Sequence, residues 1–274
     1  MAVLSISIVT YKTDLEIFRA LLDSLSLSVM ALGRDRGEEQ IPVISILDNS
    51  MDDEELLNIK AVIEDAWHFN AVSVEQADKN LGYGSGHNRC LEGLNSRYHL
   101  VLNPDVLLQP DALQQALDYM DANPDVGLLT PFATDSSGIQ TFLCKQYPAV
   151  TDLFLRGFVP GSFRKIFIDR LDRYELRGVT RDVPVKGIPI ASGCFMLFRT
   201  SVLQAIGGFS PRYFMYFEDF DLCMRLRGMA DIAYVPSVKI LHAGGDAAKK
   251  GFRHIWMFSV SAYRFFSCWG WKWS

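Results

Sequence analysis

Apolar, β-branched runs alternate with segments of helical periodicity through the first half of the chain. The run from Val3 to Val9 predicts a buried strand. Thr13 and Glu16 then have the S/T-x-x-E spacing of a capping box, which predicts that a helix starts there. The apolar face of that helix would be formed by Leu15, Phe18, Leu22, Leu25 and Val29.

The same alternation continues to residue 130 and predicts a parallel sheet flanked by helices. Pro110 is expected at the first position of one of these helices. Strands are predicted over 43–47, 71–75, 98–102 and 126–130, and helices over 52–66, 82–95 and 111–121.

The second half is less regular and predicts a mixed arrangement. A loop or hairpin is expected over 138–148 and short helices over 151–177. Further strands are predicted over 194–198, 232–235 and 238–241, and helices over 201–206, 218–226 and 252–266.

Composition removes several classes of protein. The chain has 274 residues, 49% of them hydrophobic and 22% charged, which excludes low-complexity disorder, collagen and a coiled coil. A formal net charge of −5 gives no basic face for nucleic acid. Five scattered cysteines without a C-x-x-C spacing favour reduced thiols over disulfides or zinc. With neither a signal-peptide pattern nor an apolar run of about 18 residues, we expect a cytoplasmic enzyme or one resting on a membrane surface.

Polar side chains follow several predicted strands at the point where each strand ends. Thr10 and Tyr11 follow the first strand, Asp48 the second and Asp105 the strand over 98–102. Ligands of open α/β sheets bind beyond the carboxyl ends of the strands. This placement therefore predicts a ligand site along that edge.

Four features carry candidate chemistry, each with a simpler alternative. Asp105 in Asn-Pro-Asp could hold a divalent cation, but the tripeptide is also common in turns. Residues 214–221 place three acids among aromatics, which suits a general base of raised pKa or a helix start enriched in acids. His242 could complete a metal site or contact a phosphate, or be structural. Lys249 and Lys250 could close over a diphosphate or form a solvated basic turn.

A glycine-rich loop, NLGYGSGHN at residues 80–88, precedes a predicted helix. The position three after Gly84 is His87, so the loop is not a G-x-G-x-x-G fingerprint. The loop also follows the third strand, whereas a dinucleotide fingerprint follows the first. A nicotinamide oxidoreductase is therefore the weakest of the functions considered.

Together these segments resemble the family-2 inverting glycosyltransferases of the GT-A fold, especially bacterial rhamnosyltransferases that build O-antigen and other surface polysaccharides. The motifs occur in the family's order. They are IVTYK (8–12), LDNS (47–50), NLGYGSGHN (80–88), LNPDV (102–106), ASGCFMLFR (191–199), GGFSPRYFMYFEDFDLCMRLR (207–227) and HAGG (242–245).

The resemblance implies an α/β GT-A fold with a mostly parallel sheet. Residues 1–106 would be a Rossmann-like half that binds the nucleotide sugar. Residues 107–248 would be a mixed, acceptor-binding and catalytic half of the same domain, and 249–274 a C-terminal aromatic-rich helix and tail.

The resemblance also implies roles for single residues. Thr10, Tyr11 and Asp48 would line the pocket for the base and ribose, and Gly82, Gly84 and Asn88 would lie beside the donor. Asn103 and Asp105 match the family's DXD motif; Asp105 and His242 would bind Mg²⁺ or Mn²⁺, and Asn103 the donor nucleotide. Asp219 would be the catalytic base, with Glu218 beside it toward the acceptor. Asn103 replaces the first acid of DXD, which weakens the expected dependence on metal.

The implied reaction is transfer of L-rhamnose from dTDP-L-rhamnose to a glycan hydroxyl by a single displacement. The acceptor is a growing glycan, free or carried on a polyprenyl lipid. Two alternatives remain: the same fold with a UDP- or GDP-sugar donor, and a non-catalytic module that binds a sugar nucleotide or glycan. Because a binding module needs no base, Asp105 and Asp219 together favour the enzyme.

The C-terminal segment is rich in aromatic residues, with Arg253, Arg264 and Lys272 interleaved. Aromatic and basic side chains together suit the headgroup layer of a membrane. A helix that packs on the catalytic part or on a partner subunit has the same composition. Both interpretations, peripheral membrane contact at the inner face of the cytoplasmic membrane and protein packing, are carried forward.

Overall fold

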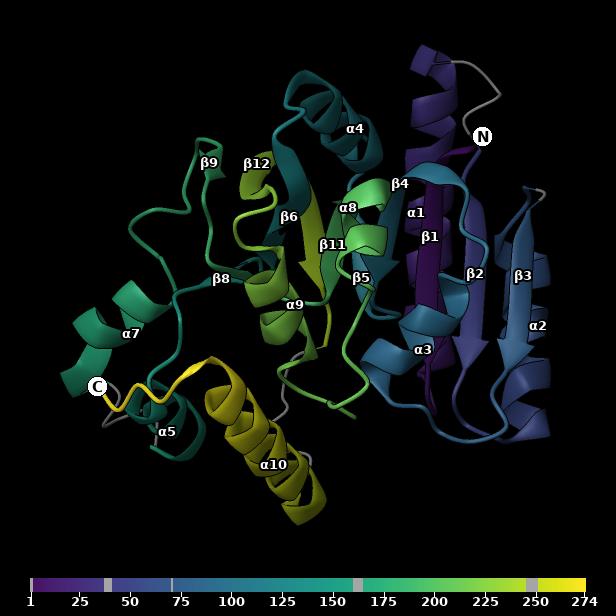
Figure 1. The fold of residues 1–274 in the computed structure, drawn as a ribbon. Helices are drawn as coiled ribbons and strands as arrows, with labels where there is room; N and C mark the ends of the chain where they lie inside the picture. The colour runs from purple at the N-terminus through teal and green to yellow at the C-terminus, as the bar shows by residue number, and fades with distance from the viewer. Residues whose placement is uncertain (1, 37–40, 70, 160–164, 245–250) are drawn as a thin grey trace.

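The computed structural model describes residues 2–36, 41–69, 71–159, 165–244 and 251–274. In the first half, parallel strands alternate with helices as the apolar pattern predicts (Figure 1). The strands are β1 (Ala2–Thr10), β2 (Val43–Asp48), β3 (Val72–Gln76) and β4 (Ser96–Leu102), and the helices are α1 (Leu15–Arg36), α2 (Asp53–Ala66) and α3 (Tyr83–Cys90).

The second half adds shorter elements to the same sheet and extends beyond it. These are β5 (Val106–Leu108), α4 (Ala112–Ala122), β6 (Val126–Thr134), β7 (Gln140–Thr141), β8 (Cys144–Lys145), α5 (Val150–Phe158), η2 (Lys165–Phe167), α7 (Ile168–Tyr174), β9 (Val185–Lys186), β10 (Ile190–Ala191), β11 (Phe195–Arg199), α8 (Thr200–Ala205), α9 (Glu218–Leu226), β12 (Asp231–His242) and α10 (Phe252–Trp269).

Strand pairing joins both halves into one sheet of order β3-β2-β1-β4-β11-β6-β12-β5. β1 pairs in parallel with β2 and β4, whereas β11 runs antiparallel to β4 and β6. β12 is parallel to β6 and antiparallel to β5. The carboxyl ends of β1, β2, β4, β6 and β12 therefore lie at the same edge as the first residues of β11.

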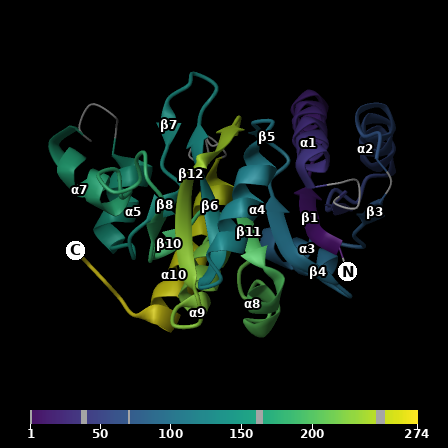
Figure 2. The same cartoon turned by 90° about the horizontal axis from the view of Figure 1, so that it is seen from above.

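Helices cover both faces of the sheet (Figure 2). Side chains of α1, α2 and α4 form one buried cluster with β1, β4 and β6, including Phe18, Ile59 and Leu113. α8 and α9 form a second cluster on the opposite face, with Leu203 and Leu222. This two-faced burial, with a largely parallel sheet between, confirms the α/β class predicted from the sequence.

The start of α1 differs from the prediction. Asp14 caps the helix, since its Oδ1 accepts hydrogen bonds from the amides of Glu16 and Ile17 at 3.0 and 3.2 Å. The capping box that was assigned to Thr13 is wrong, because the amide of Thr13 donates instead to Glu55 in α2 at 2.8 Å. A hydrogen bond to Glu55, which lies 42 positions along the chain, takes the place of the expected bond to Glu16.

Three other elements also differ. Pro110 precedes the cap residue Asp111 of α4 rather than occupying the first position of the helix. The two strands predicted over 232–241 are one strand, β12, with a register shift between Val235 and Lys239 against β6. β5 has no counterpart in the prediction, since three residues carry too little periodicity to be recognised.

The C-terminal helix α10 packs outside the two main clusters. Its buried residues Phe265 and Phe266 join Tyr213, Phe217 and Met224 in a third apolar cluster. Among the helices of the described residues, none is both long and apolar enough to cross a bilayer.

Candidate active site at the carboxyl edge of the sheet

The strand ends bring most of the predicted site residues to one edge. Thr10 ends β1 beside Asp48, which ends β2, and the Thr10 hydroxyl donates to Asp48 Oδ1 at 3.3 Å. Asn103 follows β4 and His242 ends β12 at the same edge. Tyr11 has 45% of its surface exposed, so its ring is open to a ligand.

Asp48 is fully buried and already hydrogen-bonded within the protein. Its carboxylate accepts from the amide of Ser50 at 3.0 Å and from its hydroxyl at 2.5 Å. The neighbouring Asn49 side chain accepts from the amide of Leu81 and donates to the carbonyl of Gly82. The LDNS segment therefore anchors the glycine-rich loop to β2.

The glycines of that loop pack against the chain itself. A Cβ on Gly82, whose φ is +78°, would lie 2.1 Å from the carbonyl oxygen of Phe214, and one on Gly84 would lie 2.8 Å from Phe209 Cβ. Asn88 donates to the carbonyl of Phe209 at 2.7 Å and accepts from its amide at 2.8 Å. This packing is sufficient to explain glycine at 82 and 84 and asparagine at 88. Contact of these residues with a donor stays a prediction.

Asp105 lies beside His242 at the far side of the same edge. His242 pairs with Val106 across β12 and β5, and its Nε2 lies 3.4 Å from Asp105 Oδ1. A Cβ on Gly244 would lie 1.7 Å from Asp105 Oδ2, so only glycine lets the chain pass the carboxylate. Burial raises the pKa of Asp105, but the hydrogen bond and charge of His242 outweigh it, and the pKa is lowered overall.

Asp219 occupies the first turn of α9, where two backbone amides hold its carboxylate. Gly193 donates to Oδ2 at 3.0 Å and Phe220 to Oδ1 at 2.9 Å. Burial raises the pKa of Asp219 to about 6, although these amides pull it down. Burial and the charge of Asp219 raise the pKa of Glu218 well above its usual range.

The third acid of the segment has a structural role. Asp221 forms an ion pair with Arg225 at 2.8 Å and accepts a hydrogen bond from the Trp269 indole at 2.9 Å. Two non-glycine residues of positive φ, Tyr216 at 69° and Phe217 at 64°, precede α9. Such conformations cost of order 1–3 kcal/mol each, and they turn the chain so that Glu218 and Asp219 start the helix inside the protein.

Tyr83, Gly193 and Cys194 connect the two aspartate segments. The Tyr83 hydroxyl donates to the carbonyl of Gly193 at 2.5 Å, and the carbonyl of Cys194 accepts from the amide of Asn103 at 2.9 Å. Burial raises the pKa of Tyr83, and the charges of Glu218, Asp219 and Asp105 add to the rise. Burial raises the pKa of Cys194 to about 12, with Asp105 and Asp219 again contributing. Both side chains lie within the field of both aspartates, so the two carboxylates share one region of the molecule.

Comparison with known proteins identifies the family of the chain. The family model described as "Glycosyltransferase like family 2" matches residues 25–255, which is most of the chain. The chain belongs to this family of glycosyltransferases.

Individual relatives agree with the family. The glycosyltransferase is 30% identical over 175 residues to the N-acetylglucosaminyl-diphospho-decaprenol L-rhamnosyltransferase of Mycobacterium tuberculosis strain H37Rv, covering 60% of this chain and 56% of the relative. It is 29% identical over 172 residues to the rhamnosyltransferase WbbL of Escherichia coli K12, covering 58% of this chain and 61% of WbbL. The chain thus spans little more than half the length of these relatives.

Solved structures support the fold alone. Staphylococcus aureus TarS residues 1–349 match with a TM-score of 0.56 at 15% identity, covering 97% of this chain and 72% of that one. A longer TarS structure gives 0.57 at 16% identity, covering 90% of this chain and 37% of that one. The GT-A-type α/β architecture predicted for the glycosyltransferase is confirmed.

Buried oxygens at the edge fit a divalent cation. Asn103 Oδ1 is buried without a hydrogen-bond partner in the described part of the chain, and Asp105 Oδ1 is buried with His242 Nε2 3.4 Å away. Oxygen donors are what Mg²⁺ and Mn²⁺ prefer. No group of three or more His, Cys, Asp or Glu side chains suitable for a metal occurs among the described residues, so an ion here would need ligands from the substrate and water.

Three further residues of the candidate site were not predicted from the sequence. Tyr83 and Gly193 lie inside quoted motifs, but only the three-dimensional structure shows the hydrogen bonds that connect them to Asp219. Lys145, from β8, is buried; burial lowers its pKa to about 7, and its charge reaches Asp219. No local pattern marks it. Lys249 and Lys250, the predicted diphosphate-closing pair, lie outside the described residues, as does Gly245 of the HAGG motif.

The buried acids predict an unusual dependence of stability on pH. A carboxyl whose pKa is raised by folding lowers the free energy of unfolding as pH rises from its unfolded pKa to its folded one. Glu218→Gln should therefore raise the free energy of unfolding at about pH 8, and this gain should shrink toward the ordinary glutamate pKa of about 4.3. Urea denaturation at the two pH values measures both.

Glu64→Gln is the matched control, because Glu64 lies exposed on α2. We expect this control to change stability by less than about 0.5 kcal/mol at either pH. If Glu218→Gln is less stable than wild type at about pH 8, burial does not raise the pKa of Glu218, and this prediction is contradicted.

Proposed function

We propose that this glycosyltransferase moves L-rhamnose from dTDP-L-rhamnose to a hydroxyl of a growing surface polysaccharide, such as an O-antigen, with inversion at the anomeric carbon. The observation that carries the proposal is Asp219, a half-buried carboxylate whose pKa is raised to about 6, held by two amides in the same region as Asp105. The rhamnosyltransferase names of the Mycobacterium and E. coli relatives support the choice of sugar.

Asp219 acts as the general base in a single displacement. As the acceptor oxygen forms its bond to the anomeric carbon, its proton passes to the Asp219 carboxylate, and the bond from that carbon to the diphosphate breaks. A base with a pKa near the working pH is effective in such a transfer, which contributes about 10²–10⁴-fold. The Gly193 and Phe220 amides keep the carboxylate oriented for the acceptor.

Glu218 stands beside the base on the acceptor side. Its buried Oε2 has no hydrogen-bond partner among the described residues, and burial together with the charge of Asp219 raises its pKa well above the usual range, which favours the protonated form. A protonated carboxyl donates as well as accepts, so Glu218 can hold an acceptor hydroxyl. We assign the two adjacent acids different roles, Asp219 as the base and Glu218 as the contact to the acceptor.

The donor-binding part of the site lies at the carboxyl ends of β1, β2 and β4. Thr10, Tyr11 and Asp48 form the pocket for the base and ribose, and Gly82, Gly84 and Asn88 border the donor. Asp105 and His242 would hold Mg²⁺ or Mn²⁺ next to Asn103. When bound, the ion neutralises charge on the departing nucleoside diphosphate. With asparagine in place of the first acid, one anionic contact is lost and metal dependence is partial.

These roles divide the single domain along the chain. Residues 1–106 bind the nucleotide sugar, residues 107–248 bind the acceptor and carry the base, and residues 249–274 form the C-terminal helix and tail. The name of the Mycobacterium relative places its acceptor on a diphospho-decaprenol. We extend this to a polyprenyl-linked acceptor here, met at the inner face of the cytoplasmic membrane.

A thermal-shift panel tests the donor. The purified chain is heated with dTDP-L-rhamnose, a UDP-sugar or a GDP-sugar, each with and without Mn²⁺. A ligand at a hundredfold excess over its Kd raises the free energy of unfolding by about 2.7 kcal/mol, which raises Tm by several degrees. We expect the largest rise with dTDP-L-rhamnose, and a further but modest rise with Mn²⁺.

The other outcomes of the panel are equally informative. A larger shift with a UDP- or GDP-sugar would replace the donor and keep the enzyme. No shift with any nucleotide sugar would contradict the proposed function.

The variant Asp219→Asn separates catalysis from binding. It keeps the size of the side chain but cannot accept a proton, so transfer should fall at least about 10²-fold while the donor Kd changes little. Radiolabelled sugar transfer and equilibrium dialysis measure the two quantities.

Asp111→Asn serves as the control, because Asp111 is exposed next to α4 and its side chain forms no capping hydrogen bond. Its transfer rate should equal that of wild type. If Asp219→Asn kept its turnover, the assignment of the base would fail, and the non-catalytic module would be favoured if wild type bound donor without transfer.

A further inference from the structure

The outer face of α10 carries aromatic side chains that the protein does not bury. Phe252, Trp256 and Tyr263 are separated by four and seven positions, so they lie on one stripe of the helix. Trp271, in the tail, meets the Tyr263 ring edge-on at 5.9 Å and stacks on Trp273 at 5.4 Å. We call this the C-terminal aromatic surface; its exposed members are Phe252 (81%), Ile255 (41%), Trp256 (64%), Tyr263 (64%), Trp271 (45%) and Trp273 (64%).

The surface continues onto α5. The amide of Val150 donates to the carbonyl of Lys272 at 2.8 Å, and the hydroxyl of Thr151 donates to the carbonyl of Trp273 at 2.9 Å. Phe154 on α5 has 58% of its surface exposed. Figure 1 shows α5, α10 and the C-terminus together at the lower left of the molecule.

The charge on this surface has one sign. Residues 251–274 contain Arg253, Arg264 and Lys272 and no aspartate or glutamate, in a chain whose net charge is −5. Arg253 and Arg264 are eleven positions apart, so they form a basic stripe next to the aromatic one. The segment is complementary to an anionic surface, although the chain as a whole is acidic.

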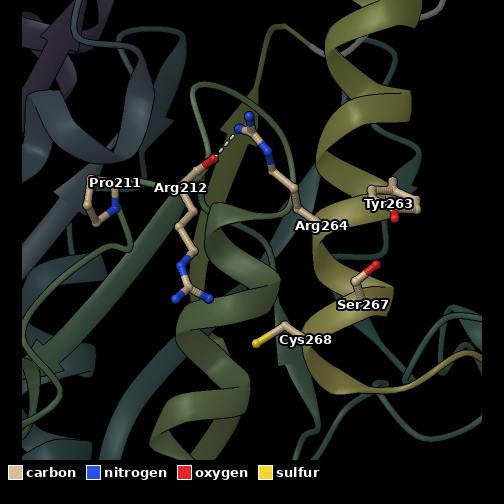
Figure 3. A pocket seen from close by; sticks show the side chains of 6 residues that line it. All are labelled: Pro211, Arg212, Tyr263, Arg264, Ser267 and Cys268. Atoms are coloured by element: carbon tan, nitrogen blue, oxygen red, sulfur yellow. Dashed lines mark hydrogen bonds between the residues drawn. The ribbon is translucent and has the colours of Figure 1, made fainter.

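A cavity beside the stripe adds Arg212 to these basic groups. It has a volume of about 480 Å³ and lies between α10 and the loop before α9 (Figure 3). Arg264 reaches across it and donates to the carbonyl of Arg212, and no described carboxylate forms a salt bridge with either guanidinium. The lining residues are Pro211, Arg212, Tyr263, Arg264, Ser267 and Cys268.

The opposite face of α10 packs against the residues just before Glu218 and Asp219. Phe217, which directly precedes Glu218, packs against Phe258 and Phe265 with ring centroids 5.2 and 5.3 Å apart. The Ser261 hydroxyl donates to the carbonyl of Met215 at 2.8 Å. Any surface that binds the outer face of α10 therefore lies at a fixed distance from the start of α9.

We propose that the C-terminal aromatic surface binds an anionic phospholipid bilayer, with phosphate groups at Arg212, Arg253 and Arg264. Tryptophan and tyrosine favour the headgroup layer, where the ring is buried and its polar atom stays hydrated. A second copy of the chain is disfavoured as occupant, because a twofold contact would place this all-basic surface against itself. The inference deepens the proposed function, since a lipid-linked acceptor would reach Asp219 from this side, but binding to lipid does not require sugar transfer.

Vesicle flotation of the full chain tests the surface. The protein is mixed with vesicles of phosphatidylcholine alone or of equal parts phosphatidylcholine and phosphatidylglycerol. We expect flotation only with phosphatidylglycerol, and weaker flotation when NaCl is raised to about 0.5 M, because salt screens the basic groups.

Two double variants separate the contributions of charge and aromatic burial. Each basic group near an anionic surface contributes about fivefold to partitioning, so Arg212→Gln with Arg253→Gln should weaken it about 25-fold. Trp256→Ser with Tyr263→Ser should weaken it at least about tenfold. Leu57→Ser with Lys60→Gln is the matched control, because these residues are an exposed apolar and basic pair on α2.

Thermal stabilisation by dTDP-L-rhamnose is measured on every variant. Unchanged donor binding shows that the fold is intact, and it separates failure of this inference from failure of the proposed function. The inference is overturned if wild type does not float with anionic vesicles or if the control and the surface variants float alike. It is also overturned if light scattering shows a dimer that Trp256→Ser with Tyr263→Ser dissociates and no vesicle binding is found.

Discussion

The hydrogen bond from the amide of Gly193 to the carboxylate of Asp219 connects two parts of the molecule that the chain itself keeps far apart. Gly193 stands just before β11, and β11 runs antiparallel between β4 and β6. Because of that direction, the start of β11 lies at the edge where β1, β2 and β4 end. The next residue, Cys194, accepts from the amide of Asn103, so Asp219 and the Asn-Pro-Asp segment are both fixed to one dipeptide.

This arrangement is costly to the folded protein. Burial disfavours the charge of Glu218 and Asp219, and Tyr216 and Phe217 hold left-handed conformations just before them. Destabilising groups of this kind are typical of functional sites, because replacing such acids would otherwise raise the stability of the protein. The aromatic packing of α10 on Phe217 offsets part of the cost and keeps the strained turn in place.

Much of the architecture could be predicted because it follows from local patterns. Apolar periodicity located the parallel strands, the helices between them and the whole of α9, and the strand ends placed Asp48 and Asp105 at one edge. What could not be predicted depends on partners distant in sequence. The antiparallel direction of β11, the pairing of β5 with β12 and the hydrogen bond from Thr13 to Glu55 are set by neighbours that no local pattern specifies. The glycines at 82 and 84 show the same limit, since their close packing partners, Phe214 and Phe209, lie far along the chain.

We propose that the diphosphate of the donor lies between Asp105 and Asp219. A crystal structure of the chain with Mn²⁺ and a dTDP-sugar, with the metal located by its anomalous scattering, tests this most directly. We expect manganese within about 2.0–2.6 Å of an Asp105 oxygen, the range of hard-cation bonds to oxygen, and the sugar's anomeric carbon facing Asp219. Density for the diphosphate away from Asp105, or a sugar turned away from the Asp219 carboxylate, would contradict it.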